Sequence, residues 1–195
     1  MIYIIRHGQT ELNNAAALQG RSDHPLNENG VAQAETAGAW FRARRIRFAR
    51  VWSSPLRRAV QTARLAAWDG TPVETDERLI EMDYGPYEGM SLAKPAPEVL
   101  VFFSDFVHNP APAGMEPLAD VVARLGAFLE ELKDCAGDGN ILISTHAIAM
   151  KGALEYLTPE SRGAYWSKNI GNCAVYQTEL VNGSYLVPVE TRMES

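Results

Sequence analysis

The sequence predicts an α/β protein with three layers, in which a mostly parallel sheet lies between two layers of helices. Short apolar stretches such as residues 2–5 and 140–145 have the length and composition of buried strands. Longer stretches such as residues 28–45 and 116–133 repeat apolar residues at helical spacing, which indicates one buried face. The two kinds of segment alternate along the chain, and such alternation is typical of a parallel sheet with helical crossovers.

Each element is expected for a local reason. Pro55 suits the first turn of a helix, so a helix is expected to begin there and to run to about Trp68. Asn182-Gly183 separates two alternating stretches, which predicts a hairpin that adds an edge to the sheet. The expected strands are residues 2–5, 49–52, 71–75, 140–145, 174–180 and 185–189. The expected helices are residues 28–45, 55–68, 98–107, 116–133 and 147–157.

Residues 80–115 form an irregular excursion that contains five prolines. Long excursions in compact domains are often lids or binding loops, so a small lid with one short helix is expected here. The aromatic residues Phe102, Phe103 and Phe106 either line a specificity wall or form the core of the lid helix. No repeat, linker or low-complexity segment interrupts the rest, so one domain over residues 1–195 is expected.

The composition excludes several classes of function. The 195 residues carry 18 Lys and Arg against 24 Asp and Glu, a formal net charge of −6. This balance argues against nucleic acid or an anionic membrane as the main partner, and the basic run Arg42–Arg50 is expected to be a solvated helix end. Apolar runs stay well short of the ~18 residues that a membrane span needs. Cys135 and Cys173 lack CxxC spacing, which favours a reducing, cytoplasmic location. For the oligomeric state, a homodimer is an open alternative to a monomer.

Polar side chains follow three of the predicted strands. Arg6-His7 ends the first strand, Arg57 follows the second, and His146 ends a later one. Because ligands bind beyond the carboxyl ends of parallel strands, these side chains are expected to gather around one point. Guanidinium groups match phosphate oxygens, and a neutral imidazole can attack phosphorus. The sequence has neither a GxxxxGKS/T loop nor an Asp/His metal grouping, so phosphoryl transfer without metal or cofactor is expected, with Glu81 as the acid.

Several segments match the signatures of one family in the family's own order. The segments are Arg6–Asn13 (RHG followed by N), Leu18–Asn27 (QGxxDxPLN), Gly30–Ala34 (GxxQA), Ser53–Ala63 (SSPLxRAxQTA), Glu81–Gly89 (ExxxGxxEG), Gly114–Arg124 (GGESLxDVxxR) and Ser144–His146. Together they cover most of the chain. The sequence thus resembles the histidine phosphatase superfamily, the phosphoglycerate-mutase-like enzymes, and the resemblance implies their three-layer fold.

The resemblance implies a role for each matched residue. His7 is the nucleophile that becomes phosphohistidine, and Glu81 is the proton donor to the leaving group and then the base for water. Arg58 is expected to be a solvated helix residue. The phosphoryl oxygens are held by Arg6, Arg57 and His146. The phosphate pocket is lined by Asn13, Gln19, Gly20 and Ala147, the last through its backbone N–H at a helix N-terminus.

The sequence also departs from the family pattern. The family usually has a glycine directly after the last histidine and an arginine five positions beyond that histidine, whereas this chain has Ala147 and Lys151. Lys151 is expected to be a helix-surface or structural charge. The family's mutases hold a second phosphate with a basic pair in the mid-chain insertion, and residues 102–110 contain no arginine. The resemblance therefore implies a metal-independent phosphomonoesterase of a small phosphorylated metabolite. The alternatives are a cofactor-dependent phosphoglycerate mutase and a catalytically decayed phospholigand-binding protein.

Overall fold

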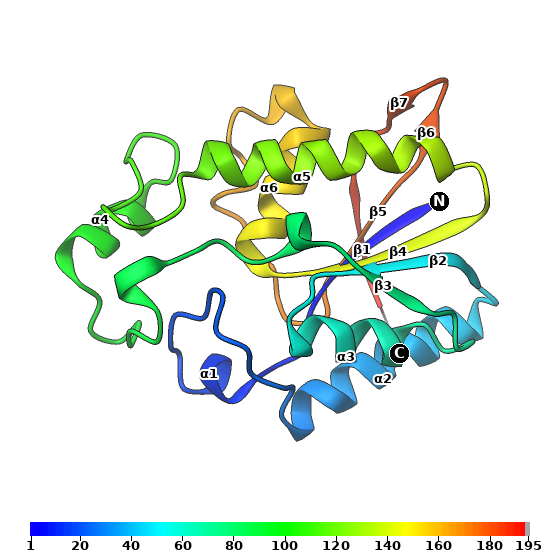
Figure 1. Cartoon of the computed structure of the whole chain (residues 1–195), viewed down its shortest axis with the longest axis horizontal. Coiled ribbons are helices and arrows are strands. Elements are labelled where there is room, and N and C mark those ends of the chain that lie inside the picture. Colours follow the sequence, from blue (N-terminus) through cyan, green and yellow to red (C-terminus); the bar gives the residue numbers. More distant parts are fainter. Residues whose placement is uncertain (194–195) are drawn as a thin grey trace.

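The computed structural model describes residues 1–193, and a six-stranded sheet forms its centre (Figure 1). The strands lie in the order β3-β2-β4-β1-β5-β8. Strands β1 to β4 are parallel to one another, whereas β5 runs antiparallel to β1 and β8 runs antiparallel to β5. The predicted, mostly parallel sheet is therefore confirmed. The strand bounds are Ile2–Arg6 (β1), Phe48–Ser53 (β2), Val73–Thr75 (β3), Asn140–Thr145 (β4), Val175–Thr178 (β5) and Val189–Thr191 (β8).

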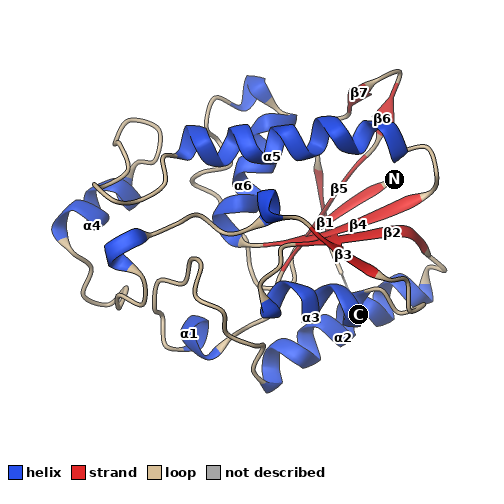
Figure 2. Cartoon of the chain, viewed as in Figure 1, coloured by secondary structure: helices blue, strands red, loops and turns tan. Residues whose placement is uncertain are grey.

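Helices cover both faces of the sheet, which confirms the predicted three-layer arrangement (Figure 2). The helix bounds are Glu11–Asn14 (α1), Glu28–Ala43 (α2), Arg57–Ala66 (α3), Pro97–Ser104 (α4), Leu118–Leu132 (α5) and Ala147–Leu157 (α6). Side chains alternate along β1, so Ile2 and Ile4 join the core under α5 and α6, whereas Tyr3 and Ile5 join the core under α2 and α3. No helix within residues 1–193 combines the length and the apolar character that crossing a membrane requires.

The C-terminal hairpin is smaller than predicted. Asn182 and Gly183 both have positive φ angles, 51° and 78°, as a two-residue hairpin turn requires. The turn joins only β6 (Leu180–Val181) to β7 (Ser184–Tyr185), and these strands pair as a separate two-stranded sheet. The chain then returns to the main sheet as β8, so β8 and not the hairpin forms the edge of that sheet.

The excursion at residues 80–115 lies on the side of the sheet toward which β1 runs. In Figure 1 the chain enters β1 at the N label, and α4 lies at the opposite end of the molecule. Helix α4 ends at Ser104, because the Asp105 carboxylate accepts hydrogen bonds from the next backbone N–H groups, those of Val107 and His108. Phe102 is fully buried as lid core, whereas Phe103 and Phe106 are only partly buried.

Candidate active site

The parallel topology brings the polar ends of three strands together. His7 follows β1, Ser54 follows β2, and His146 follows β4 as the N-cap residue of α6. Both histidines are buried, and their ring centroids lie 5.1 Å apart. The structure thus places His7 and His146 in one cluster, although they lie 139 positions apart in the sequence.

A buried arginine joins the two imidazoles. The Arg58 Nε lies 3.3 Å from His7 Nε2 and 3.2 Å from His146 Nδ1, so one N–H is shared between the two rings. The guanidinium also donates to the backbone carbonyls of Ser22 and Gly20, at 2.7 and 2.6 Å. Burial lowers the pKa of Arg58 to about 10, so the group remains a cation at neutral pH. Arg58 is therefore the central cation of the cluster.

The structure does not bring Arg57 into the cluster; Arg58, expected to be a solvated helix residue, is buried in the place expected for Arg57. The Arg57 side chain is exposed, and its backbone N–H donates to Asp23 Oδ1 at 2.7 Å. Neighbouring residues of a helix point about 100° apart, so only one of Arg57 and Arg58 can face the strand ends at the start of α3. The signal was present in the sequence: in the pattern SSPLxRAxQTA, aligned on Ser53, the arginine falls on Arg58 and the variable position on Arg57.

The hydrogen bonds define the tautomer of each histidine. His7 Nδ1 lies 2.7 Å from the Gly8 carbonyl and donates to it, which leaves a lone pair on Nε2 that faces Arg58. His146 Nδ1 accepts from Arg58, so its Nε2–H donates to Ser54 Oγ at 2.7 Å. Burial, and then the charge of Arg58, hold the pKa of both histidines well below the usual 6.5. Both imidazoles are therefore neutral at pH 7, as a nitrogen nucleophile requires.

Glu81 is buried at the N-terminus of α6. Its Oε1 accepts from the backbone N–H groups of Met82 and Ala149, at 2.8 and 2.9 Å, and its Oε2 accepts from that of Ile148 at 3.1 Å. A carboxylate is favoured at a helix N-terminus, where backbone N–H groups are free. The Glu81 carboxylate also opposes the lowering of the pKa of Arg6 and Arg58, so it lies within electrostatic range of the cationic cluster.

The residues expected to line a phosphate pocket gather around Gln19. The Gln19 Oε1 accepts from Thr10 Oγ1 at 2.7 Å and from Asn13 Nδ2 at 3.4 Å. Within residues 1–193, Gln19 Nε2 and Arg6 Nε are buried donors without an acceptor. Two buried donors of this kind beside cationic Arg58 suit an anion, because an unpaired buried polar group is costly.

Gly20 and Ala147 are expected to line the phosphate pocket, and the structure shows what surrounds the backbone at each of them. The Gly20 N–H donates to both carboxylate oxygens of Glu88 at 3.0 Å, so Gly20 holds the loop in position rather than offering its N–H to a ligand. Ala147 is half-buried at the first position of α6, and the two N–H groups that follow it are taken by Glu81. A methyl group is thus accommodated after His146 without displacing the helix N-terminus.

Sequence reasoning missed two further residues of this cluster. Ser54 Oγ accepts from His146 Nε2–H and so holds the tautomer of that histidine. Asn172 comes from the segment before β5, and its amide donates to the His7 carbonyl at 3.0 Å and to Asn13 Oδ1 at 3.2 Å. The serine belongs to the SSPL segment and could have been found there, whereas no local pattern marks Asn172. Within residues 1–193, no three His, Cys, Asp or Glu side chains group as possible metal ligands.

Comparisons with known proteins show the family of this chain. The family model of the histidine phosphatase superfamily (branch 1) matches residues 2–188. The chain belongs to the histidine phosphatase superfamily. It is 30% identical over 184 residues to a putative phosphoserine phosphatase 2 of Hydrogenobacter thermophilus, covering 92% of this chain and 89% of the relative. It is 31% identical over 175 residues to a 2,3-bisphosphoglycerate-dependent phosphoglycerate mutase of Xanthobacter autotrophicus, covering 82% and 83%.

A solved structure similar to this histidine phosphatase comes from Entamoeba histolytica. It is a phosphoserine phosphatase mutant in complex with phosphoserine, with a TM-score of 0.80, 26% identity, and coverage of 98% of this chain and 94% of the other. Together with the family match, these relatives support a phosphomonoesterase of small phosphorylated metabolites. The mutase alternative is weaker, because residues 95–113 of the lid contain neither Arg nor Lys to hold a second phosphate.

Proposed function

We propose that this histidine phosphatase hydrolyses phosphomonoesters through a phosphohistidine on His7, without a metal ion. The main support for this proposal is the lone pair on His7 Nε2, which faces the Arg58 cation. The donors of Arg6 and Gln19 that lack an acceptor belong to the same site. A neutral nucleophile surrounded by donors is matched to an electrophilic phosphoryl group with anionic oxygens.

The reaction divides into two displacements. In the first, His7 Nε2 forms a bond to phosphorus while the bond from phosphorus to the ester oxygen breaks, and the leaving alcohol takes a proton from Glu81, which enters this step as the protonated acid and leaves it as the carboxylate. In the second, Glu81 removes a proton from water, the water oxygen attacks phosphorus, and the bond to Nε2 breaks. Arg6 and Arg58 hold the phosphoryl oxygens in both steps, supplying the charge stabilisation that metals supply elsewhere. His146 joins them by turning its Nε2–H from Ser54 Oγ to a phosphoryl oxygen.

Glu81 is favoured for the proton-transfer role by its position. Within residues 1–193 it is the only fully buried carboxyl group, and it lies within electrostatic range of Arg6 and Arg58. Its three backbone hydrogen bonds hold the side chain in one orientation, which general acid–base catalysis requires. Asn13, Gln19 and Ala147 complete the proposed phosphate pocket, and Gly20 positions Arg58 through its carbonyl.

We propose that the enzyme works in a reducing cytoplasm and that its substrates are small molecules rather than nucleic acid. Both cysteines are free, and burial raises the pKa of the Cys173 thiol to about 12, which supports a thiol without redox function. In the basic run, the Arg44 guanidinium lies 4.0 Å from the centroid of the Trp40 ring, which supports a helix end whose cations are already engaged.

The test is hydrolysis of p-nitrophenyl phosphate between pH 5 and 8 in the presence of EDTA. We expect the wild-type chain to be active, His7→Ala to be inactive, and the matched control His108→Ala, on an exposed lid histidine, to keep wild-type activity. Phosphohistidine is labile in acid, so quenching with acid would destroy the intermediate. The reaction with labelled substrate is therefore quenched in alkali to trap it. Loss of activity in EDTA, or full activity in His7→Ala, would contradict the proposal.

A further inference from the structure

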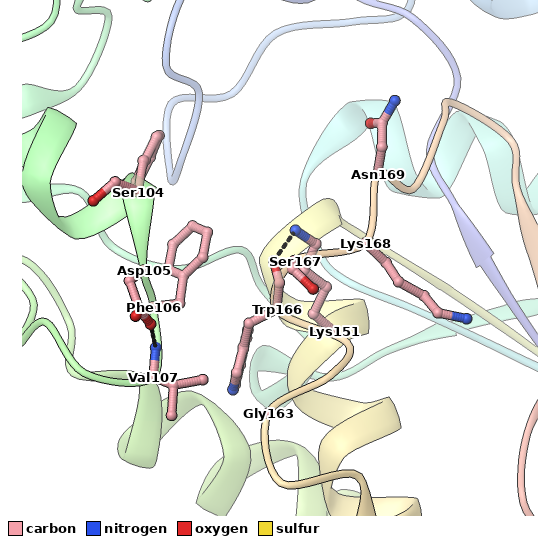
Figure 3. A pocket seen from close by; sticks show the side chains of 11 residues that line it. Ser104, Asp105, Phe106, Val107, Lys151, Gly163, Trp166, Ser167, Lys168 and Asn169 are labelled. Atoms are coloured by element: carbon pink, nitrogen blue, oxygen red, sulfur yellow. Dashed lines mark hydrogen bonds between the residues drawn. The ribbon is translucent and has the colours of Figure 1, made fainter.

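A cavity of about 590 Å³ lies between the end of the lid helix and the segment that precedes β5 (Figure 3). One wall is formed by Phe103–Val107 and the other by residues of Gly163–Asn169. Lys151 of α6 lies between the walls. None of these side chains has a role in the two displacements described above.

The cavity adjoins the proposed phosphoryl site. Lys151 lies one and a half helical turns after His146, on the helix whose N-terminus holds Glu81. The Arg6 guanidinium donates to the carbonyl of Ile170, the residue directly after the wall residue Asn169. The charges of Glu81 and Arg6 both act on the pKa of Lys151, the carboxylate raising it and the guanidinium lowering it. These contacts place one wall of the cavity next to the groups that surround His7.

The walls combine aromatic surface with one free cation. The rings of Phe106 and Trp166, which both line the cavity, lie 6.3 Å apart, centroid to centroid. Lys151 Nζ lies 5.4 Å from the Phe106 centroid and donates one hydrogen bond, 2.7 Å long, to the Trp166 carbonyl. An ammonium group has three donors, so two remain for a ligand.

The other charged groups that line the cavity are occupied elsewhere. The Asp105 carboxylate binds His108 Nδ1 at 2.7 Å and two backbone N–H groups. The Lys168 ammonium lies 5.1 Å from the centroid of Tyr165 and points away from the cavity (Figure 3). Within the described chain, Lys151 is thus the one cavity-lining cation that is directed at the space between the walls.

Burial makes an anionic ligand favourable at this position. Desolvation lowers the pKa of Lys151, and a buried ammonium gains free energy when an anion pairs with it. A single ammonium matches a monoanionic carboxylate better than a dianionic phosphate, for which several cations or a guanidinium fork are usual.

We propose that this cavity binds the leaving alcohol of the substrate and that Lys151 selects a short alcohol carrying a carboxylate. The inference rests on the proposed phosphatase function and adds to it a residue that determines specificity. Phe106 and Trp166 limit the width of the alcohol, and Lys151 pairs with its carboxylate.

The test compares two substrates that differ in one group. Glycerol 3-phosphate carries a hydroxymethyl group where 3-phosphoglycerate carries a carboxylate, and p-nitrophenyl phosphate reports the chemistry alone. We expect wild-type kcat/KM to be at least tenfold higher for 3-phosphoglycerate than for glycerol 3-phosphate. Lys151→Met is expected to raise KM for 3-phosphoglycerate and so to remove this preference. For glycerol 3-phosphate and p-nitrophenyl phosphate, kcat/KM should stay within about twofold of the wild-type value.

The control variants separate specificity from folding. Lys151→Arg keeps the charge and should keep most of the preference, and Lys168→Met should behave as wild type. An equal loss for all three substrates in Lys151→Met would assign the side chain to loop structure and overturn the inference. A wild-type enzyme that cleaves p-nitrophenyl phosphate without any preference for the carboxylate would overturn it too, with the proposed function intact. If the wild-type enzyme cleaved none of the three substrates, both the proposed function and this inference would be wrong.

Discussion

Arg58 connects three separate parts of the chain through one guanidinium group. It contacts His7 after β1 and His146 after β4, and it donates to the carbonyls of Gly20 and Ser22 in the loop between. A guanidinium presents its donors in a fixed planar arrangement, so these partners fix its position from several directions. The neutral state of both histidines depends in part on this charge.

Replacing Arg58 and Arg57 separately tests which of the two arginines acts in the site. Arg58→Met keeps a similar length but removes every donor, so we expect kcat/KM for p-nitrophenyl phosphate to fall by roughly 10²–10³, the usual cost of removing a donor to transition-state charge. Arg57→Met removes an exposed side chain, and we expect kcat/KM within about twofold of wild type. Thermal unfolding of both variants shows whether they are folded. Equal losses in the two variants would contradict the assignment.

The site was predictable residue by residue only where a local pattern carried the information. His7, His146 and Glu81 each stand at a strand end or in a distinct loop motif, and the structure brings them together. The choice between two adjacent arginines required either strict alignment of the motif or the three-dimensional direction of α3. Asn172 was not predictable, because it reaches His7 from a segment 165 positions away and no motif surrounds it.

The element that presents His7 depends on close backbone contact with α2. An added Cβ on Gly30 would lie 2.0 Å from the Gln9 carbonyl oxygen, and one on Gly8 would lie 2.4 Å from the Gly30 carbonyl oxygen. The Asn27 N–H donates to the Gln9 carbonyl at 3.0 Å, which holds the two segments at this distance. The start of α2 therefore supports the loop that carries His7, the proposed nucleophile.

Gly30→Ala tests this contact. The methyl group meets backbone that cannot move without shifting the loop, so we expect a loss of about 1–3 kcal/mol in the free energy of unfolding. Activity should fall as well, since His7 lies in the displaced segment. Gly137→Ala is the matched control, because a Cβ there meets nothing within 4 Å, and it should leave both properties unchanged. Urea unfolding measures both variants; an unchanged Gly30→Ala would show that the loop is not held by α2.

Elements with strong local signals were predicted closely. The expected strand at 140–145 and helix at 147–157 coincide with β4 and α6, because a buried apolar run and a long apolar face are unambiguous. The hairpin was predicted in its turn but not in its extent. The Asn-Gly pair determines the turn locally, whereas β8 pairs with β5 through contacts that the hairpin sequence does not contain.

At the scale of the whole molecule, the buried histidines couple stability to pH. In the unfolded chain a histidine titrates near pH 6.5, whereas burial and Arg58 hold the pKa of His7 and His146 well below that value in the folded chain. Below about pH 6.5 the unfolded state therefore binds more protons than the folded state, and the free energy of unfolding falls as the pH falls. Each histidine contributes a slope of at most about 1.4 kcal/mol per pH unit.

Urea unfolding at pH 7.5, 6.0 and 5.0 in a buffer without phosphate measures this dependence. We expect wild-type stability to decrease between pH 6.5 and 5, above the range in which most carboxyl groups titrate. His146→Asn should show a smaller decrease, because one titrating group is removed, whereas His108→Asn, on an exposed lid residue, should follow the wild type. A flat wild-type profile across this interval would contradict the burial of two neutral histidines.

The sequence by itself determined the α/β class, the two histidines at strand ends, the turn at Asn182-Gly183 and the family, because these depend on local periodicity and on motifs in a defined order. Only the tertiary structure decided that Asn172 reaches His7 and that Lys151 faces a cavity beside the lid. The physical reason is that the direction of a side chain and its degree of burial depend on contacts between distant segments. Neither residue type nor spacing along the chain contains those contacts.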